Sequence, residues 1–382
     1  MIYLDNAATS FFKPRCVVGA VNSALTHLSA NPGRGGHTLA IKCASLVHQT
    51  RRKVADFLKL ECGNVVFTLN CTHALNFAIN GFIKSGGHII TTMYEHNSVL
   101  RPLSELARSG HIALTVLPPD SNDAVSSVAI ERAIRRSTYM VVTNHISNVT
   151  GAVAPIEAIA RVCKNAGVLY VVDAAQSAGL VDIDMRCGID MVALAPHKSL
   201  HGIQGVGALA IKSGLSPKPQ FMGGTGTDST SLFQPRELPE SLESGTLPTP
   251  AIAALNVAVD YTKKHINEYR ALLASLSELA IRELKAINNV TIYTAPSSVG
   301  GIVSFNIQGL HSSEVAEILS TKYNIYLRGG LHCAPLVHQH LGTTGQGIVR
   351  ASFGADNTIG DVETLVSAVI EIVATQKRAT DL

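Results

Sequence analysis

Residues 168–198 read VLYVVDAAQSAGLVDIDMRCGIDMVALAPHK and decide the fold predicted for this chain. Two short apolar runs, 168–172 and 191–195, are followed by polar residues, among them Asp173 after the first and Lys198 after the second. Near-continuous apolar runs of this length are typical of strands buried in a parallel sheet. We expect one helix and one strand between Asp173 and Lys198, so that both side chains lie at the same edge of the sheet.

Similar apolar runs alternate with amphipathic stretches from about residue 50 to residue 212. The stretches at 72–83, 126–135 and 155–166 have the periodicity of helices. This alternation predicts an α/β fold with a mostly parallel sheet that is covered by helices on both faces. The predicted strands are 65–69, 88–92, 113–117, 139–144, 168–173, 191–195 and 206–211.

The second half of the chain predicts a smaller α/β domain. Residues 213–250 are rich in Gly, Ser, Thr and Pro, which is typical of ordered loops, and a long helical pattern follows at about 250–287. The predicted elements after it are strands at 290–294, 302–307 and 325–328, and helices at 312–321 and from about 359. We predict a large domain over 14–250, and a small domain formed by 1–13 and 251–382.

The composition excludes several classes of protein. Hydrophobic residues make up 46% of the 382 residues and charged residues 15%, which is an ordinary globular composition without signs of disorder. A formal net charge of +3 and the absence of basic runs argue against nucleic acid as a partner. Residues 1–15 do not read as a secretory signal, and no apolar run is long enough for a membrane helix.

The seven cysteines are widely spread and include no CxxC pair, which indicates neither a zinc site nor a disulfide framework. We therefore expect no bound metal and a reducing, cytoplasmic location. Six cysteines are expected to be small buried hydrophobic residues. These six are Cys16, Cys43, Cys62, Cys71, Cys163 and Cys187.

Polar residues recur where predicted strands end, which is where ligands bind in open parallel sheets. Asp173 is consistent with a helix cap, or with a carboxylate that keeps a pyridine nitrogen protonated. Lys198 is consistent with a solvated surface residue, or with a desolvated amine that forms an imine with an aldehyde cofactor. The apolar run before Lys198 and the glycines after it favour the second interpretation.

Three further strand ends carry candidate ligand-binding groups. Thr72 begins a predicted helix whose backbone N–H groups suit a phosphate, although an ordinary threonine N-cap gives the same pattern. His96 is either a core histidine or a ring that stacks on an aromatic cofactor. Asn148 follows the strand 139–144 and offers an amide to a ring substituent.

The segment 328–335, RGGLHCAP, holds the one cysteine in a glycine-flanked polar context. We expect a mobile loop that lets the Cys333 thiol reach a pocket, with Arg328 and His332 favouring the thiolate; an incidental buried cysteine is the alternative. Arg350 lies in an apolar run, where it needs a carboxylate partner. That partner is either structural or the carboxylate of an amino-acid substrate.

Over nearly its whole length the chain resembles the cysteine desulfurases of the class V aminotransferase family. The resemblance rests on Tyr3-Leu-Asp-Asn-Ala-Ala-Thr9, Glu95-His96, Asn148, Asp173-Ala-Ala-Gln176, His197-Lys198, Glu243-Ser-Gly-Thr246, His332-Cys333-Ala334 and Arg350-Ala-Ser-Phe353. It implies a transferase that depends on pyridoxal 5'-phosphate (PLP). The implied fold is fold type I, similar to aspartate aminotransferase, with a seven-stranded sheet in the large domain.

The resemblance also implies roles around the cofactor. Lys198 forms the covalent bond to the PLP aldehyde, Asp173 faces the pyridine nitrogen and Gln176 faces the phenolic oxygen. His96 stacks on the ring and takes part in catalysis, and Asn148 lies beside it. The phosphate is held by Thr72, His73 and His197.

The implied substrate site lies in the small domain, where Arg350 binds the substrate carboxylate with help from Asn148 and Arg328. Cys333 is the implied acceptor of sulfur, and its short segment is similar to the branch that includes sulfur-assembly desulfurases and selenocysteine lyases. Thr246 is implied to reach the phosphate site of a second subunit, which predicts a homodimer.

Two positions depart from the family pattern. Ala195 stands where relatives carry a serine that binds the phosphate, so Ser199 is expected to supply the missing hydrogen bond. Gly33 stands where relatives often carry histidine, which puts substrate contacts near that loop in question.

The implied reaction converts L-cysteine to L-alanine and leaves the sulfur on Cys333 as a persulfide, for transfer to an acceptor protein. One alternative is a selenocysteine lyase acting on L-selenocysteine, and another is a different PLP reaction such as transamination. A catalytically silent docking partner is the third alternative, against which the intact set of Asp173, Lys198, Cys333 and Arg350 argues.

Overall fold

The computed structural model of the chain describes residues 1–33, 35–60, 65–120, 125–227 and 229–380. Cys62 lies outside the described residues. The elements of the larger part are α1 (Arg15–His27), α2 (Thr38–Phe57), β2 (Val65–Thr68), α3 (Cys71–Asn80), β3 (Gly87–Thr92), α4 (Asn97–Arg108), β4 (Ile112–Leu117), α5 (Ser127–Ala133), β5 (Thr138–Asn144), α6 (Ile156–Ala166), β6 (Leu169–Asp173), the 3₁₀ helix η1 (Met185–Cys187), β7 (Met191–Leu194) and β8 (Gly207–Ile211).

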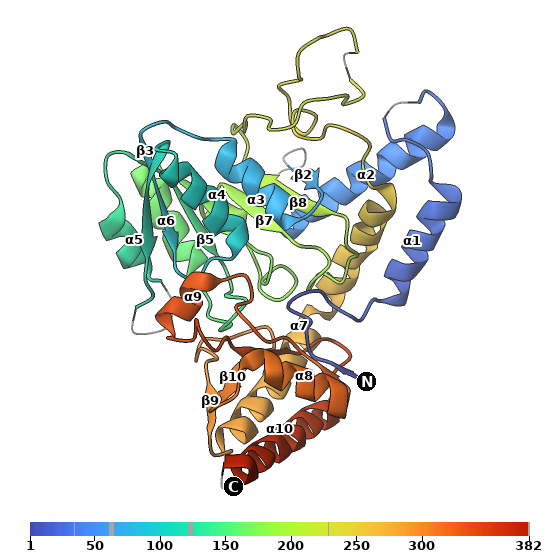
Figure 1. The fold of residues 1–382 in the computed structure, drawn as a ribbon. Coiled ribbons are helices and arrows are strands. Elements are labelled where there is room, and N and C mark those ends of the chain that lie inside the picture. The colour runs from blue at the N-terminus through green and yellow to red at the C-terminus, as the bar shows by residue number, and fades with distance from the viewer. Residues whose placement is uncertain (34, 61–64, 121–124, 228, 381–382) are drawn as a thin grey trace.

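The long helix α7 (Thr249–Lys285) leads into the smaller part. The elements of that part are β1 (Ile2–Tyr3), β9 (Val290–Ile292), β10 (Ile302–Ile307), α8 (Ser312–Tyr323), β11 (Ile325–Tyr326), α9 (Pro335–His340), β12 (Val349–Ser352) and α10 (Ile359–Thr380). Figure 1 shows the large sheet and its helices above, and α8, α10, β9 and β10 below, with the N-terminus beside the lower part.

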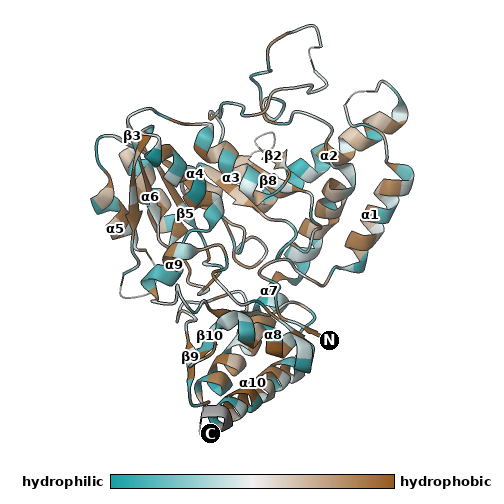
Figure 2. Cartoon of the chain, viewed as in Figure 1, coloured by the Kyte–Doolittle hydropathy of each residue, from teal (hydrophilic) through white to brown (hydrophobic). Residues whose placement is uncertain are grey.

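The large sheet has the strand order β2-β8-β7-β6-β5-β3-β4. Strand β8 pairs antiparallel with β2 and β7, and the other pairs are parallel. The seven strands predicted from the apolar runs are therefore confirmed, and so is the mostly parallel α/β fold. Figure 2 shows that hydrophobic residues dominate the strands, whereas the flanking helices carry both hydrophobic and hydrophilic residues. The strands could therefore be recognised from the sequence.

The helix expected between Asp173 and Lys198 was a wrong prediction, since the described residues there contain only the single 3₁₀ turn η1. Gly179 and Gly188 interrupt the segment with φ angles of 96° and 119°, which a right-handed helix excludes. A Cβ atom at Gly179 would lie 2.5 Å from the carbonyl oxygen of Ser199, so the backbone passes close to the residues that follow Lys198. Asp173 and Lys198 still share an edge, because β6 and β7 are parallel neighbours.

The smaller part contains the antiparallel sheet β12-β10-β9 and the parallel pair β1-β11. Helix α7 contributes to two cores: Ile252 and Leu255 pack beneath the large sheet, and Leu273 and Leu276 pack in the smaller part, where they join Leu4 from the N-terminus. A domain boundary at residue 250 therefore stays a prediction. No described helix combines the length and apolar character that a membrane span requires.

A buried ion pair fixes the edge of the large sheet. The Arg51 and Glu243 side chains are each 7% exposed and are joined by two parallel contacts, of 2.7 and 2.9 Å. Arg51 also donates to the carbonyl oxygen of Val65, and Glu243 accepts the N–H of Phe67 at 2.6 Å. The pair thus ties α2 and β2 to the loop that precedes α7.

Replacing Glu243 by glutamine is expected to lower the free energy of unfolding by about 3–5 kcal/mol, because a buried guanidinium loses its counter-charge. Urea unfolding followed by circular dichroism measures the change. Glu105→Gln breaks the exposed pair with Arg108 and serves as a control in which little change is expected. If both variants lose the same free energy of unfolding, burial of the Arg51–Glu243 pair does not explain the effect.

Candidate active site

A cavity of about 220 Å³ lies at the carboxyl ends of the parallel strands β5, β6 and β7. Seven of the residues singled out in the sequence line it. These are Thr72, His96, Asn148, Asp173, Gln176, His197 and Lys198. The structure thus brings together side chains that follow neighbouring strands. The residues that do not line the cavity are His73, Thr246, Arg328, Cys333 and Arg350.

Lys198 follows β7 through a tight turn, in which its N–H donates to the carbonyl oxygen of Ala195 at 3.1 Å. Within the described part of the chain, Nζ of Lys198 forms no hydrogen bond or ion pair. Burial lowers the pKa of Lys198, and the nearby Asp173 carboxylate opposes that shift. An amine with a lowered pKa and no fixed partner is suited to react with an aldehyde.

Asp173 is 5% exposed and ends β6 inside the cavity. Its Oδ1 accepts the N–H of Ala175 at 2.9 Å and the thiol of Cys71 at 3.7 Å. Burial, reinforced by the Asp173 charge, raises the pKa of Cys71 well above its usual value, so this thiol stays protonated. Cys71 therefore lines the cavity, whereas it was predicted to be only a small buried hydrophobic residue.

The other cysteines correct a second expectation. Cys43 and Cys163 are buried as predicted, but Cys16 is exposed and Cys187 is partly exposed.

No group of three or more His, Cys, Asp or Glu side chains that could hold a metal ion occurs among the described residues.

The start of α3 faces the cavity and is capped by Asn70, not by Thr72. Asn70 Oδ1 accepts the N–H of His73 at 2.9 Å. The N–H groups of Cys71 and Thr72 have no acceptor within the described residues, which suits an anion. The His73 ring does not line the cavity, because its Nδ1 accepts the N–H of Leu69 at 3.2 Å.

His197 is fixed by the N-terminal segment. Its Nδ1 lies 3.1 Å from Thr9 Oγ1, and its carbonyl oxygen accepts the Ser10 hydroxyl at 3.0 Å. Lys13 Nζ donates to the same serine oxygen at 2.6 Å. Burial, with the charges of Lys198 and Lys13, lowers the pKa of His197 to about 4, so its ring is neutral near pH 7.

Ser199 does not replace the missing serine at position 195. Ala195 lines the cavity without a hydroxyl, and the Ser199 side chain instead contacts Tyr269 on α7. The turn that follows explains this direction, because His201 has a φ of 57° and donates its N–H to the carbonyl oxygen of Lys198 at 2.8 Å.

His96 and Gln176 form two further walls of the cavity. His96 caps α4, and its Nδ1 accepts the N–H of Ser98 at 3.1 Å, which leaves the ring proton on Nε2. Burial lowers the pKa of His96, so a neutral aromatic ring faces the cavity. Gln176 donates from Nε2 to the carbonyl oxygen of Ala7 at 2.9 Å, which adds the N-terminal segment to the wall.

Cys333 lies in a tight turn that abuts the cavity wall. Asn97 donates its N–H to the Cys333 carbonyl oxygen at 2.7 Å, and Asn148 Nδ2 donates to the His332 carbonyl oxygen at 2.8 Å. His332 and Cys333 both have left-handed backbones, with φ of 50° and 56°. These two bonds hold the turn against the start of α4 and against Asn148, and the mobility expected from the sequence stays a prediction. The Cys333 side chain is exposed.

His332 cannot favour a thiolate in the way that was expected. Its ring is buried, donates from Nε2 to the Ile348 carbonyl oxygen at 2.8 Å, and has its pKa lowered to about 2, mainly by burial. The imidazole is therefore neutral and supplies no positive charge to Cys333. Arg328 is exposed, and its backbone pairs with that of Arg350.

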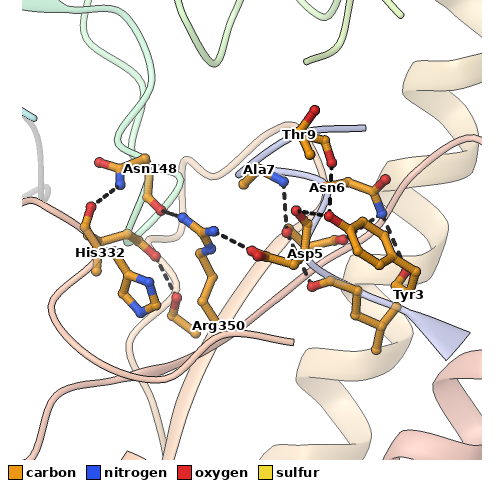
Figure 3. A network of polar contacts seen from close by, with 12 residues as sticks. Tyr3, Asp5, Asn6, Ala7, Thr9, Asn148, His332 and Arg350 are labelled. Atoms are coloured by element: carbon orange, nitrogen blue, oxygen red, sulfur yellow. Dashed lines mark hydrogen bonds and ion pairs between the residues drawn. The ribbon is translucent and has the colours of Figure 1, made fainter. Parts of the chain in front are cut away.

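Arg350 lies on β12 and is 1% exposed. Its Nη1 donates to the carbonyl oxygen of Asn148 at 2.9 Å and its Nη2 to Oδ1 of Asp5 at 2.7 Å, as Figure 3 shows. Its Nε is buried and has no partner within the described residues. The carboxylate that a buried arginine requires is here Asp5, which leaves the Nε–H group without an acceptor among the described residues.

The comparisons with known proteins agree with this geometry. The aminotransferase class-V family model matches residues 2–365. The chain belongs to this family. A protein of Methanothermobacter thermautotrophicus named "Probable cysteine desulfurase" is 31% identical over 97% of this chain and 94% of its own. A protein of the same name from Aeropyrum pernix is 33% identical over 99% of this chain and 95% of its own. The apo structure of a cysteine desulfurase from Thermococcus onnurineus is 32% identical in sequence and superposes with a TM-score of 0.91. The match covers 98% of this chain and 95% of that one.

This class-V chain carries one buried acid, Glu95, to which no role was predicted from the sequence. Glu95 is fully buried beside the cavity; its Oε1 accepts the Thr92 hydroxyl at 2.6 Å, and its Oε2 has no partner within the described residues. Burial, with the Asp173 charge, raises the pKa of Glu95 well above its usual value of 4.5. Burial therefore favours the neutral form of this carboxyl in the folded chain.

Glu95→Gln is expected to become more stable relative to wild type as the pH rises from 5 to 8. Above pH 4.5 the unfolded state of the wild type loses a proton that the folded state keeps, so the wild type loses stability with rising pH. Glutamine carries no such proton. Unfolding by urea at several pH values measures the difference, with the exposed Glu157→Gln as control. A difference that stays constant or falls with pH would contradict a raised pKa of Glu95.

Proposed function

We propose that this chain is a PLP-dependent cysteine desulfurase that converts L-cysteine to L-alanine and takes the sulfur onto Cys333. One observation carries the proposal: a cavity that joins the Lys198 amine to the Asp173 carboxylate is bordered by the turn that bears the exposed Cys333. The full-length similarity to proteins named cysteine desulfurase supports the same reaction.

The residues around the cavity fit PLP chemically. The unpartnered amine of Lys198 suits the aldehyde, and the buried carboxylate of Asp173 suits a protonated ring nitrogen. The neutral ring of His96 suits stacking, and the open N–H groups at the start of α3 suit the phosphate together with Thr72 and His197. Gln176 has a second amide hydrogen for the phenolic oxygen. When bound, PLP supplies an electron sink that weakens bonds at the substrate Cα and Cβ.

The proposed roles of the other residues follow from their contacts. Arg350 and Asn148 bind the α-carboxylate of cysteine, with Arg328 at the rim, and the freed amine of Lys198 moves a proton from the substrate Cα. The Cys333 sulfur attacks the substrate sulfur, the Cβ–S bond breaks, and its electron pair returns to the carbon skeleton. Protonation releases alanine, and the persulfide stays on Cys333.

We also propose that two copies of the chain form a homodimer in which Thr246 contributes to the partner's phosphate site. Thr246 is exposed and lies outside its own cavity, which a contribution to another subunit requires. The loops between β8 and α7 expose large apolar side chains that an interface would cover. These are Phe221, Met222, Leu232 and Phe233. The exposed Cys333 also suits handover of sulfur to an acceptor protein in a reducing compartment.

The deciding experiment mixes the PLP-loaded protein with L-cysteine and follows alanine and protein-bound persulfide together. We expect alanine and one persulfide per chain in the first turnover, with the persulfide mapped by mass spectrometry to the peptide of Cys333. A parallel reaction with L-selenocysteine separates a selenocysteine lyase, and formation of a keto acid would indicate transamination. If cysteine gives neither alanine nor persulfide, the desulfurase proposal fails.

A further inference from the structure

We propose that Asp5 is a resident carboxylate on Arg350 that the α-carboxylate of the substrate displaces, so that Asp5 sets how tightly the site takes an amino acid. This inference rests on the proposed role of Arg350 as the carboxylate-binding residue. The contact joins residues that are 345 positions apart and connects the N-terminal segment to β12.

The Arg350 guanidinium has acceptors on both Nη atoms but, in the described part of the chain, none on Nε. A carboxylate that binds a guanidinium side-on takes the Nε–H together with an N–H of the adjacent Nη2. In Figure 3 the Asp5 carboxylate lies against Nη2, whereas Nε has no partner within the described residues. Asn148 uses its carbonyl oxygen on Nη1, at the far side. A second carboxylate that binds side-on would use the Nε–H and would share Nη2 with Asp5, so that the two carboxylates compete for the same nitrogen.

Arg350 itself cannot move away to meet the substrate elsewhere. Its backbone pairs with Ser304 of β10 on one side and with Arg328 on the other. The Arg350 side chain is 1% exposed, whereas that of Asp5 is 22% exposed. Asp5 can therefore turn toward water and be solvated, and a desolvated Arg350 cannot. The part that moves is the carboxylate of Asp5.

Electrostatic repulsion favours displacement of Asp5 by the substrate carboxylate over binding of both carboxylates to Arg350. Two carboxylates on one guanidinium repel each other, and a buried site weakens this repulsion less than water does. Backbone contacts on both sides of Asp5, from Leu4 to the carbonyl oxygen of Tyr326 (2.7 Å) and from Asn6 to that of Ser352 (3.3 Å), keep the segment in place while the side chain turns. Asp5 thus keeps Arg350 paired between turnovers and competes with each incoming substrate.

The test uses the PLP-loaded protein and isothermal titration calorimetry with two probes, L-alanine and L-alaninamide, which share the amine but differ in the carboxylate. In Asp5→Asn the dissociation constant for L-alanine is expected to fall about tenfold relative to wild type, because a competing charge is removed. The constant for L-alaninamide is expected to stay unchanged. Asp356→Asn removes a neighbouring charge that does not touch Arg350 and is the matched control.

Weaker or unchanged binding of L-alanine by Asp5→Asn would overturn the inference, since it would make Asp5 an aid to Arg350 or irrelevant to it. If Asp5→Asn does not fold, a crystal structure of the wild type with L-alanine decides the question. We expect the alanine carboxylate on Nε and Nη2, with Asp5 more than about 4 Å from Nη2. An intact Asp5 contact would overturn the inference. Wild type that turns over no cysteine would count against the desulfurase proposal, whatever the two probes show.

Discussion

Replacing Lys198 by alanine is expected to lower cysteine turnover by at least about 10³-fold, since the same amine is proposed to hold the cofactor and to move the substrate proton. The environment of this amine supports the size of the effect. Burial lowers its pKa and no described residue binds Nζ, so it is available as a nucleophile and a base. Steady-state formation of alanine measures the loss.

Borohydride treatment tests whether Lys198 is the residue that binds PLP covalently. In the wild type it should fix PLP covalently to the peptide that contains Lys198, and in Lys198→Ala it should fix none. Lys212→Ala is the matched control, because Lys212 follows the neighbouring strand but pairs with Asp190 at 3.1 Å outside the cavity. Covalently fixed PLP or near-normal turnover in Lys198→Ala would refute the assignment.

The fold was predictable from the sequence because the strands of the large sheet are buried on both faces. Such strands must be apolar throughout, so each run is visible without knowledge of its neighbours. The segment between Asp173 and Lys198 was misread for the opposite reason. Its apolar residues suggested a helix, but Gly179 and Gly188 adopt backbones that depend on a close approach to the Ser199 region, which only the folded chain reveals.

The same distinction applies to the candidate site. Asp173, Lys198 and Asn148 could be placed together because parallel strands bring their carboxyl ends to one edge. The partner of Arg350 could not be identified, because Asp5 meets it only through packing of the N-terminal segment on β12. The neutral state of His332 was hidden for a related reason, since its burial and its bond to Ile348 depend on residues that follow in the chain.

Cys333→Ala is expected to abolish persulfide formation and cysteine turnover while PLP binding persists, because Cys71, the cysteine that PLP would lie beside, cannot replace it. Cys71 lines the cavity, but its thiol donates to Asp173 and burial raises its pKa well above the usual value, so it is not a nucleophile near pH 7. Absorbance of bound PLP, alanine formation and persulfide mapping together measure the outcome. Activity toward selenocysteine is expected to fall less, since selenium leaves its carbon more readily than sulfur.

Two control variants make this result specific. Cys16 is exposed like Cys333 but lies on α1, so Cys16→Ala should retain both persulfide and turnover and thereby exclude a general effect of losing an exposed thiol. Cys71→Ala should also retain the persulfide on Cys333, because the Cys71 thiol is expected to stay protonated. If turnover survives in Cys333→Ala and the persulfide maps to Cys71, the sulfur acceptor lies inside the cavity, and the turn held by Asn97 and Asn148 has another purpose.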